Sequence, residues 1–528
     1  MIKFNPARCA LAAAVAVATF GSPLVASAAE SKARVIVNYD QASSAKVRAA
    51  IAKLGGRVVV DLSEVNAVAV TLPAGKLRAL KALRGVEGVE EDSIQTLQGG
   101  RQAFGAPLVL AAVAETVPYG IPMVQAQAGS LPALAAGTGK RVCIVDSGIN
   151  ATHEDLAANT MAGKNYVGVG DWNTDENSHG THVAGTVAAI DNAVGVVGVA
   201  PNRELKLYIS KVFDAAGSSA SSLIAKGMLG CLQGKSNVLS MSLGGSSASS
   251  LQQKIATLLA SRNVLMIAAA GNAGTSAVSY PAGFAEVVSV AAVDSSKVKA
   301  SFSQFNADVE ISGPGVGTLS TVPAGSQLGA TASVGSTPFT VLGMDGSPIA
   351  TANGALANFG FGDVPAAGSM TGKVCLISRG NISFADKVLN CQASGGVGAI
   401  IYNNTAGELA GTMGDVVTAI PSVGATQADG GVMLTKLGQA AQVSVAFNND
   451  LYAAYSGTSM ATPHVSAVAA LVWSHFPTCT AAQIRAHLTG SAENLEAAGR
   501  DVNTGFGLVQ ARAMYDRIAS FGCAGPAN

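Results

Sequence analysis

Short runs of apolar residues recur through the middle of the chain, and helical patterns fall between several of them. The runs are nearly continuous rather than alternating with polar residues, which predicts strands buried on both faces. Such strands form a parallel sheet with helices on both faces, an α/β fold. The predicted strands are residues 142–145, 205–212, 237–243, 264–270 and 287–293.

A smaller unit precedes this region. Its pattern predicts the order strand, helix, strand, strand, helix, strand, which is the split βαβ or ferredoxin-like arrangement of an α+β domain. The elements are expected at residues 34–39, 42–54, 58–60, 67–72, 76–83 and 88–95. The residues from there to Val117 are rich in Gly, Ala, Gln and Val, and we expect a linker.

The pattern changes again near Pro323. Residues 325–449 are rich in Gly, Ser and Thr and carry short strand patterns, and a helical pattern resumes at Ser459. We therefore expect a β-rich domain inserted into the α/β domain. Its clearest elements are a strand at 372–379, a helix at 384–393 and a strand at 399–402.

The first 28 residues have the features of a secretory signal peptide. Lys3 and Arg8 give a positive start, residues 9–20 are apolar, and Ala26-Ser27-Ala28 fits the small-residue cleavage pattern. The alternative is a buried core helix or a membrane anchor, but a bilayer span needs about 20 apolar residues. We expect a secreted, extracellular protein without a membrane span, exported directly or through the periplasm.

The composition limits the classes of binding partner that we expect. The 528 residues include 33 Lys plus Arg and 33 Asp plus Glu, so the formal net charge is zero. A neutral chain offers no bulk attraction for nucleic acid or anionic lipid, and we expect neither as a partner. Hydrophobic residues make up 49% and charged residues 12% of the chain, which excludes a disordered protein. We expect a globular monomer.

The cysteines indicate an oxidising compartment. Seven are present, and removal of the signal peptide with Cys9 leaves an even number, which suggests disulfide bonds. Locality favours pairing neighbours along the chain, but the sequence does not choose among the pairings, and reduced buried thiols are the alternative. No C-x-x-C motif supports a zinc or thioredoxin-like site. The disulfide candidates are Cys143, Cys231, Cys375, Cys391, Cys479 and Cys523.

Asp146 directly follows a predicted strand, and ligands of open parallel sheets bind beyond the carboxyl ends of strands. His179 and His182 are spaced so that they share one face of a helix. A zinc site of the metalloprotease type needs two histidines four apart with a glutamate beside the first, and that pattern is missing here. Taken singly, Asp146 could cap a turn and the histidines could pack at a helix start.

Ser459 stands at the start of the predicted helix that runs to Val472. A helix N-terminus presents free N–H groups and a partial positive charge, which stabilise a developing oxyanion. The alternative for a lone serine there is an ordinary N-cap. A serine nucleophile needs an imidazole base and a carboxylate that orients the base, and the chain supplies Asp, His and Ser in that order. This order is that of the subtilisins, not of the α/β-hydrolases.

The chain resembles the subtilisin-like serine peptidases, or subtilases, from about Val117 to Phe521 with the insertion excluded. The resemblance implies that Asp146 orients the base, that His179 is the base and that Ser459 attacks the scissile carbonyl. His182 is then a packing residue, and Asn272 donates to the oxyanion. The matching motifs are Asp146-Ser147-Gly148, residues 179–186, Gly271-Asn272 and residues 457–464.

The resemblance also implies how substrate is bound. An extended peptide would pair with the strand segment Ser242, Leu243 and Gly244. The wall Ala269, Ala270 and Gly271 would line the pocket for the residue before the cut, with Ser279 at its floor. The lining is small and apolar and contains no carboxylate, so we expect an apolar or aromatic preference rather than a basic one.

A structural calcium ion is implied by the loop that follows the histidine helix. In relatives with such a loop, an Asn side chain and loop carbonyls bind calcium, a cation that takes six to eight oxygen ligands. An ordinary polar loop is the alternative. No catalytic cofactor is implied. The candidate ligands are Glu115, Asp155, Ile190, Asn192, Val194 and Val196.

The flanking pieces resemble parts of secreted subtilases. Residues 34–97 resemble the inhibitor propeptide that assists folding and blocks the site until it is cut away, with the cut between about 98 and 114. The insertion resembles a protease-associated domain, which has no chemistry of its own. The expected domains are a signal peptide at 1–28, a propeptide at 30–113, a catalytic domain at 114–324 and 450–528, and the insertion at 325–449.

These inferences predict a secreted serine endopeptidase that cuts proteins through an acyl-enzyme and is made as a self-processed zymogen. Its partners would be protein or peptide substrates and its own propeptide. A catalytically silent binding or scaffold protein on the same fold is the alternative, although silent relatives usually lack one of the groups that this chain has. An esterase of the lipase type lacks its G-x-S-x-G motif here.

Overall fold

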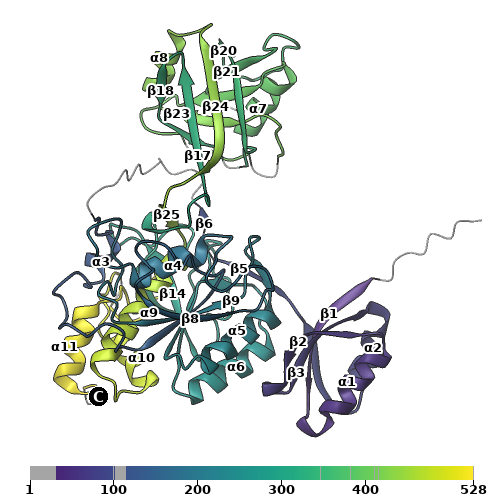
Figure 1. The fold of residues 1–528 in the computed structure, drawn as a ribbon, viewed down its shortest axis with the longest axis vertical. Coiled ribbons are helices and arrows are strands. Elements are labelled where there is room, and N and C mark those ends of the chain that lie inside the picture. Colours follow the sequence, from purple (N-terminus) through teal and green to yellow (C-terminus); the bar gives the residue numbers. More distant parts are fainter. Residues whose placement is uncertain are drawn as a thin grey trace, which may run out of the picture.

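The computed structural model describes residues 31–98, 100–101, 115–344, 346–380, 382–409, 411–413, 416–496 and 498–526. The expected signal peptide therefore lies outside the described residues. Figure 1 shows three bodies: an α/β body, a smaller domain beside it at the N-terminal end of the chain, and an inserted domain above it.

The α/β body is built on a seven-stranded parallel sheet in the order β15-β14-β13-β11-β7-β9-β8. All five apolar runs contain a strand of this sheet, but the run 237–243 was too long as one strand, because Leu243 lies in a separate short strand of another sheet. Two strands of the sheet were not predicted, β8 and β15. The bounds are β7 Arg141–Asp146, β8 Thr160–Asn165, β9 Lys206–Lys211, β11 Val238–Met241, β13 Leu265–Ala269, β14 Val287–Val293 and β15 Val309–Pro314.

Helices pack on both faces of this sheet, as the apolar strands predicted. One apolar cluster joins the sheet to α4 and α9, and a second joins its other face to α5 and α6. The helices of the body are α3 Gly120–Met123, α4 His179–Ala188, α5 Ser221–Gln233, α6 Ser250–Ser261, α9 Thr458–His475, α10 Ala481–Gly490 and α11 Ala511–Phe521.

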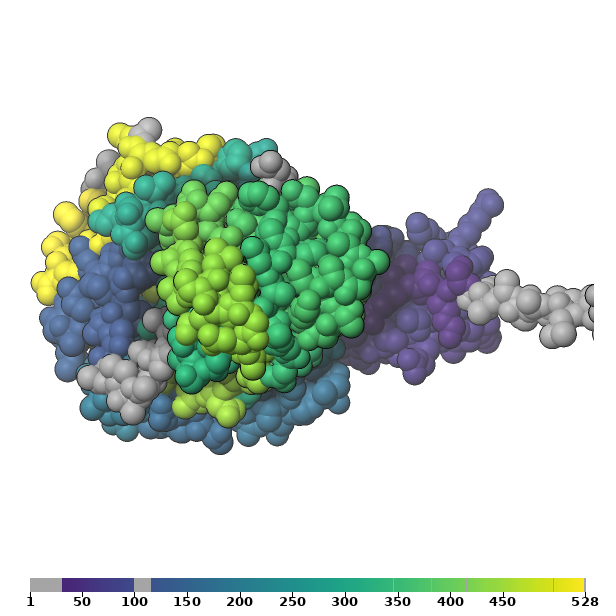
Figure 2. Space-filling model, turned by 90° about the horizontal axis from the view of Figure 1, so that it is seen from above, coloured from purple at the N-terminus to yellow at the C-terminus, as the bar shows by residue number. Residues whose placement is uncertain are grey.

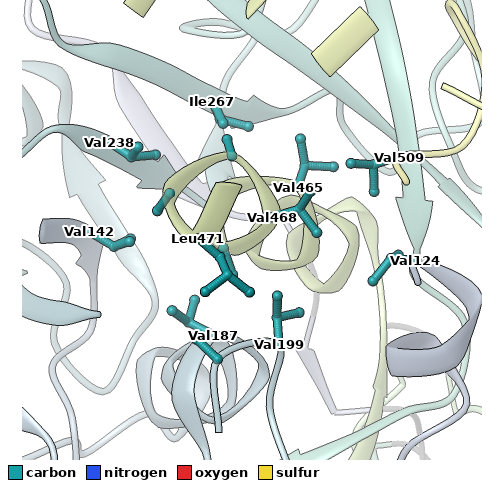
Figure 3. Packing of buried hydrophobic residues seen from close by; sticks show 14 of the residues in the cluster. Val124, Val142, Val187, Val199, Val238, Ile267, Val465, Val468, Leu471 and Val509 are labelled. Carbon is teal, nitrogen blue, oxygen red and sulfur yellow. The ribbon is translucent and has the colours of Figure 1, made fainter. Parts of the chain in front are cut away.

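Helix α9 is the centre of the core. Its first sixteen residues, Thr458 to Trp473, are all buried, so the helix is enclosed rather than amphipathic. Figure 3 shows Val465, Val468 and Leu471 of α9 among apolar side chains from the sheet and from α4. This enclosure fixes the position of the N-terminal turn of α9, where Ser459 lies.

The N-terminal domain has the predicted order of elements, in a four-stranded antiparallel sheet β2-β3-β1-β4. Its last expected strand, 88–95, was wrong as one element. The chain leaves the sheet after β4, and Ile94 begins a separate strand, β5, that pairs with the α/β body. The bounds are β1 Lys32–Tyr39, α1 Ser44–Lys53, β2 Arg57–Leu62, β3 Ala67–Pro73, α2 Leu77–Lys81, β4 Val86–Glu91 and β5 Ile94–Leu97.

The inserted domain is a β-rich body with an eight-stranded mixed sheet in the order β18-β17-β24-β20-β21-β22-β23-β19. In Figure 2, viewed from above, it lies over the α/β body. The bounds are β17 Gln327–Val334, β18 Thr337–Phe339, β19 Val341–Gly343, β20 Ala350–Asn358, β21 Lys373–Ser378, α7 Phe384–Ala393, β22 Gly398–Tyr402, β23 Ser422–Ala425, α8 Gln427–Leu434 and β24 Ala440–Asn448.

Two small sheets join the bodies. One is β10-β5-β12, and the other is β16-β25-β6. In each, a strand from the N-terminal part of the chain pairs with strands of the α/β body. The bounds are β6 Gly100–Arg101, β10 Ser218–Ala220, β12 Leu243–Gly244, β16 Thr318–Thr321 and β25 Tyr452–Ser456.

Three disulfide bonds are formed, with the pairing that locality favoured. Cys143 of β7 is bonded to Cys231 of α5, Cys375 of β21 to Cys391 of α7, and Cys479 to Cys523. Each bond stays within one body, so the N-terminal domain has no covalent crosslink to the rest among the described residues. Cutting the chain after that domain would therefore leave it held by noncovalent contacts alone.

Candidate active site

Asp146 and His179 are brought together at the carboxyl end of the parallel sheet. The Nδ1 atom of His179 lies 2.8 Å from Oδ1 and 3.0 Å from Oδ2 of Asp146. Asp146 ends β7, and His179 begins α4, so both side chains are fixed by rigid elements. The pair is buried, with 1% of the histidine side chain and none of the carboxylate exposed.

A second carboxylate, Asp175, holds the helix that carries His179. It accepts hydrogen bonds from the N–H groups of Ser178 (2.9 Å) and Thr181 (2.8 Å) and from the Thr181 hydroxyl at 2.6 Å. Ser178 itself is at the N-cap but offers no side-chain cap. Asp175 thus satisfies two of the free backbone donors at the start of α4, and the Gly180 N–H donates to the Ser147 hydroxyl at 2.9 Å. It also accepts from the Ser147 hydroxyl beside Asp146 (2.8 Å), which links the two carboxylate positions.

Ser459 is the second residue of α9 and is completely buried. Its Oγ donates a hydrogen bond of 2.8 Å to the carbonyl of Ser242. The Nε2 atom of His179 is buried and has no hydrogen-bond partner among the described residues. The structure therefore does not hydrogen-bond the serine to the histidine, but it leaves the basic nitrogen free.

The segment that follows the N-terminal domain lies beside Ser459. Strand β5 pairs antiparallel with β12, Leu97 opposite Leu243 and Thr96 opposite Gly244, and it pairs with β10 on its other edge. The N–H of Gln98 donates to the Ser242 carbonyl (3.1 Å), and the N–H of Ser459 donates to the Gln98 carbonyl at 2.9 Å. The chain thus holds one of its own carbonyl groups against the N-terminus of α9.

Asn272, which follows β13, also contacts this N-terminus. Its Oδ1 accepts hydrogen bonds from the N–H and the hydroxyl of Thr458, at 2.9 and 2.8 Å. Because the oxygen of the amide is occupied in this way, the Nδ2 group is left to donate elsewhere. Gly271 precedes it with a φ of 111°, and the ideal Cβ position there would collide with Gln304, so glycine is required.

The segments expected to line the pocket are also at this edge of the sheet. Ala269 and Ala270 are buried at the end of β13, and Ser279 Oγ packs against Gly244. The Gln98 side chain makes a polar contact here, because its Nε2 donates a hydrogen bond of 3.1 Å to the Gly244 carbonyl.

The other histidines of these motifs are buried and neutral. His182 stacks on Tyr455, and its Nε2 lies 3.0 Å from two backbone carbonyls. Burial lowers the pKa of His182 to about 3 and that of His464 to about 4, so neither carries a charge near neutral pH.

The expected calcium ligands meet in one place. Asp155, which is completely buried, accepts from the Asn192 amide (2.9 Å) and from the Val196 N–H (3.0 Å). Glu115 accepts from the Asn192 N–H at 2.7 Å. Burial raises the pKa of both carboxyl groups. No cluster of three or more His, Cys, Asp or Glu suited to a metal occurs in the described ranges, so any ion there would depend on carbonyl oxygens as well.

The N-terminal domain also caps two helices of the α/β body. Asp92 accepts from the Ser222 N–H at the start of α5 (2.8 Å). Glu90 accepts from the N–H groups of Ser250 and Leu251 at the start of α6, at 2.8 and 3.1 Å. Negative charge at these N-termini is favourable, so the two carboxylates fasten the domain to the body.

Sequence reasoning missed Asp175 and Gln98. Asp175 stands four residues before His179 and one before Glu176, in a polar stretch that reads as an ordinary loop. An acidic residue just before a helix start is the feature that could have marked it as a cap. Gln98 lies in the expected linker, and no local pattern distinguishes it.

Comparison with known proteins identifies all three bodies. The model of the "Subtilase family" matches residues 137–353 and 413–507, and that of the "PA domain" matches residues 339–432. A "Putative peptidase inhibitor domain" matches residues 12–92.

The chain is also similar in sequence to curated subtilisins. The chain is 37% identical to subtilisin E of Bacillus subtilis (strain 168) over 307 residues, which is 56% of this chain and 74% of that protein. It is 43% identical to subtilisin DY of Bacillus licheniformis over 215 residues, 40% of this chain and 77% of that protein.

Among solved structures, a psychrophilic subtilisin-like protease, Apa1 from the Antarctic psychrotroph Pseudoalteromonas sp. AS-11, matches with a TM-score of 0.55 and 40% identity. The match covers 78% of this chain and all of that one. Fervidolysin from Fervidobacterium pennivorans matches in fold with a TM-score of 0.57 at 23% identity, over 92% of this chain and 61% of that one. The chain belongs to the subtilase family of serine endopeptidases.

Proposed function

We propose that this subtilase is a secreted, self-processed zymogen whose triad is Asp146, His179 and Ser459. The observation that carries the proposal is the Gln98 carbonyl, which the Ser459 N–H holds at 2.9 Å while strand β5 pairs with the cleft. A carbonyl in that position is bound as the scissile carbonyl of a substrate would be. Among the described residues, no helix has the length and apolar character to cross a membrane.

The chemistry follows from the groups around that carbonyl. Ser459 Oγ must turn from the Ser242 carbonyl toward His179 Nε2, which takes its proton as Oγ attacks the carbonyl carbon. Asp146 holds the Nδ1 side of the ring and stabilises the imidazolium. The Ser459 N–H and Asn272 Nδ2 would donate to the oxyanion, the imidazolium would give its proton to the leaving amine, and water would then release the acyl group.

Substrates would bind as β5 does, by backbone pairing with Ser242, Leu243 and Gly244. The residue before the cut would enter against Ala269, Ala270 and Gly271. Since Gln98 occupies this position in the uncut chain, the preference there includes a polar residue as well as the apolar ones expected from the lining.

The first self-cleavage would break the peptide bond after Gln98, because the carbonyl held by Ser459 belongs to that residue. The proposed propeptide thus ends at Gln98, within the expected range of 98 to 114. Residues 30–113 would act as propeptide and linker, 114–324 and 450–528 as the catalytic domain, and 325–449 as the protease-associated insertion. The N-terminus of the released chain, Gly99, is checked by sequencing.

Labelling with a fluorophosphonate probe tests the proposed chemistry against the silent-scaffold alternative. We expect the probe to attach to Ser459 of the processed protein, and we expect prior phenylmethylsulfonyl fluoride to block it. Ser466→Ala removes another buried serine of α9 and should still be labelled. A processed protein that takes up no probe at Ser459 would support the scaffold function instead.

We further propose that the loop at Asn192 holds a structural calcium ion. Carboxylate, amide and carbonyl oxygens are the ligands calcium prefers, and the loop brings the Asp155 carboxylate, which is completely buried, and the half-buried Glu115 together around Asn192. The side chains of Glu115, Asp155 and Asn192 and the carbonyls of Ile190, Val194 and Val196 would supply the ligands. The bound ion would brace the segment between α4 and β9.

Chelation should lower the thermal stability of the processed protein. A ligand at 100 times its dissociation constant stabilises the folded state by about 2.7 kcal/mol, which chelation removes. The melting temperature is measured by calorimetry with calcium and with EDTA. The isosteric variant Asp155→Asn should lose most of this response. An unchanged melting temperature in EDTA would contradict a structural calcium ion at this loop.

A further inference from the structure

A buried pair of glutamine side chains joins the cleft-bound segment to the wall of the cleft. Nε2 of Gln95 donates to Oε1 of Gln252, and Nε2 of Gln252 donates to Oε1 of Gln95, both at 2.9 Å. Gln95 is 1% exposed and Gln252 is completely buried. Gln252 belongs to α6 of the α/β body, and Gln95 belongs to β5.

The orientation of both amides is fixed by backbone carbonyls. Nε2 of Gln252 also donates to the carbonyl of Ser221 (3.2 Å), and Nε2 of Gln95 also donates to the carbonyl of Tyr280 (3.3 Å). Each amide nitrogen therefore donates one hydrogen to a backbone carbonyl and the other to the side-chain oxygen of the opposite glutamine. The network has no place for a carboxylate, because its second oxygen would face the Tyr280 carbonyl and Gln252 Oε1.

Gln95 is the fourth residue before the scissile bond proposed above, counting back from Gln98, whose carbonyl Ser459 holds. It leads, through Thr96 and Leu97, to Gln98. Its side chain is buried where that of Thr96 is exposed, so the α/β body can recognise the residue at this position. Gly245 leaves room for it, since an added Cβ there would lie 3.0 Å from Gln95 Cγ.

We propose that Gln252 makes the protease select glutamine at the fourth position before the scissile bond. This inference rests on the proposed function, because it takes β5 as bound in the manner of a substrate. A substrate with an apolar residue there leaves Gln252 Oε1 buried without a donor, and a site with an unpaired polar group rejects such an analogue strongly. A glutamate is rejected because it cannot donate to that oxygen.

Peptide substrates of the form succinyl-Xaa-Thr-Leu-Gln-p-nitroanilide test the selection on the processed wild-type protein. We expect kcat/KM for glutamine to exceed that for leucine or glutamate by tenfold or more. The variant Gln252→Leu should favour leucine over glutamine. Gln253→Leu changes the same residue type at the next, exposed position of α6 and should keep the wild-type preference.

The uncut chain provides a second measurement that needs no added substrate. Gln95→Leu should slow self-cleavage, and the double variant Gln95→Leu, Gln252→Leu should recover much of the lost rate because it pairs two apolar groups. Wild-type protein that prefers leucine over glutamine, or a Gln252→Leu variant that keeps the glutamine preference, would overturn the proposal. If no peptide is cut and no self-cleavage occurs, the result contradicts the proposed function itself. If peptides are cut without a preference for glutamine, the result contradicts only the proposed selection by Gln252.

Discussion

Replacing Ser459 by alanine should leave the chain uncut and without proteolytic activity. The substitution removes the proposed nucleophile and keeps the N–H that holds the Gln98 carbonyl. The loss expected is about 10⁶-fold in kcat, the magnitude known for removal of the nucleophilic serine of subtilisin. Hydrolysis of a casein substrate and gel analysis of the secreted precursor measure the two effects.

The uncut variant also separates chemistry from folding. Ser459→Ala removes only an oxygen whose hydrogen bond goes to the Ser242 carbonyl, so the precursor should fold and keep its three disulfide bonds. The Gln98 carbonyl stays bound in the variant's own cleft, so wild-type protease added in trace amounts should cut after Gln98 only when this segment leaves the cleft. If the Ser459→Ala precursor processed itself at the normal rate, the assignment of Ser459 would be wrong.

The strands of the parallel sheet could be predicted where both of their faces are buried, because such strands consist almost entirely of apolar residues. Strand β13 is apolar throughout because both of its faces are covered, and a continuous apolar run reports that burial directly. Strand β8 was missed because it lies at the edge of the sheet, where exposed and half-buried residues alternate and a Gly and an Asn interrupt the apolar pattern. Strand β15 was missed because Glu310 and Gly313 stand inside it, the former paired with Arg485.

The split between β4 and β5 could not be predicted locally. Both segments have strand-like sequences, and between them lies Asp92, whose carboxylate accepts hydrogen bonds from the start of α5 and from Arg34 of β1. The contact with α5 joins residues 130 positions apart. The same holds for the Gln95–Gln252 pair, whose members are 157 positions apart and look like surface glutamines in their own elements.

The residues of the catalytic motifs could be named from the sequence because their neighbours form a recognisable pattern. The hydrogen bonds among these residues could not be predicted from the sequence. In the structure, Nε2 of His179 has no partner among the described residues, and Ser459 Oγ and the Gln98 N–H share the Ser242 carbonyl as acceptor. Release of the segment would free the Ser242 carbonyl from Gln98 and open the cleft to other peptides.

Replacing Asn272 by leucine should lower kcat by about 10²–10³-fold and change KM little. The magnitude is again the one known for the equivalent asparagine of subtilisin. The physical reason is that Asn272 Nδ2 would donate only to charge that develops in the transition state, and such an interaction raises kcat rather than ground-state affinity. Steady-state kinetics on a peptide p-nitroanilide measure both constants.

Two further variants separate donation from positioning. Asn272→Asp can still accept from the Thr458 N–H and hydroxyl but has no N–H to donate, so it should be as defective as the leucine variant. Thr458→Val removes one of the two groups that orient the amide and leaves the donor in place, so its loss should be smaller. An Asn272→Asp variant with wild-type kcat would show that the amide only braces Thr458, and the oxyanion would then depend on the Ser459 N–H alone.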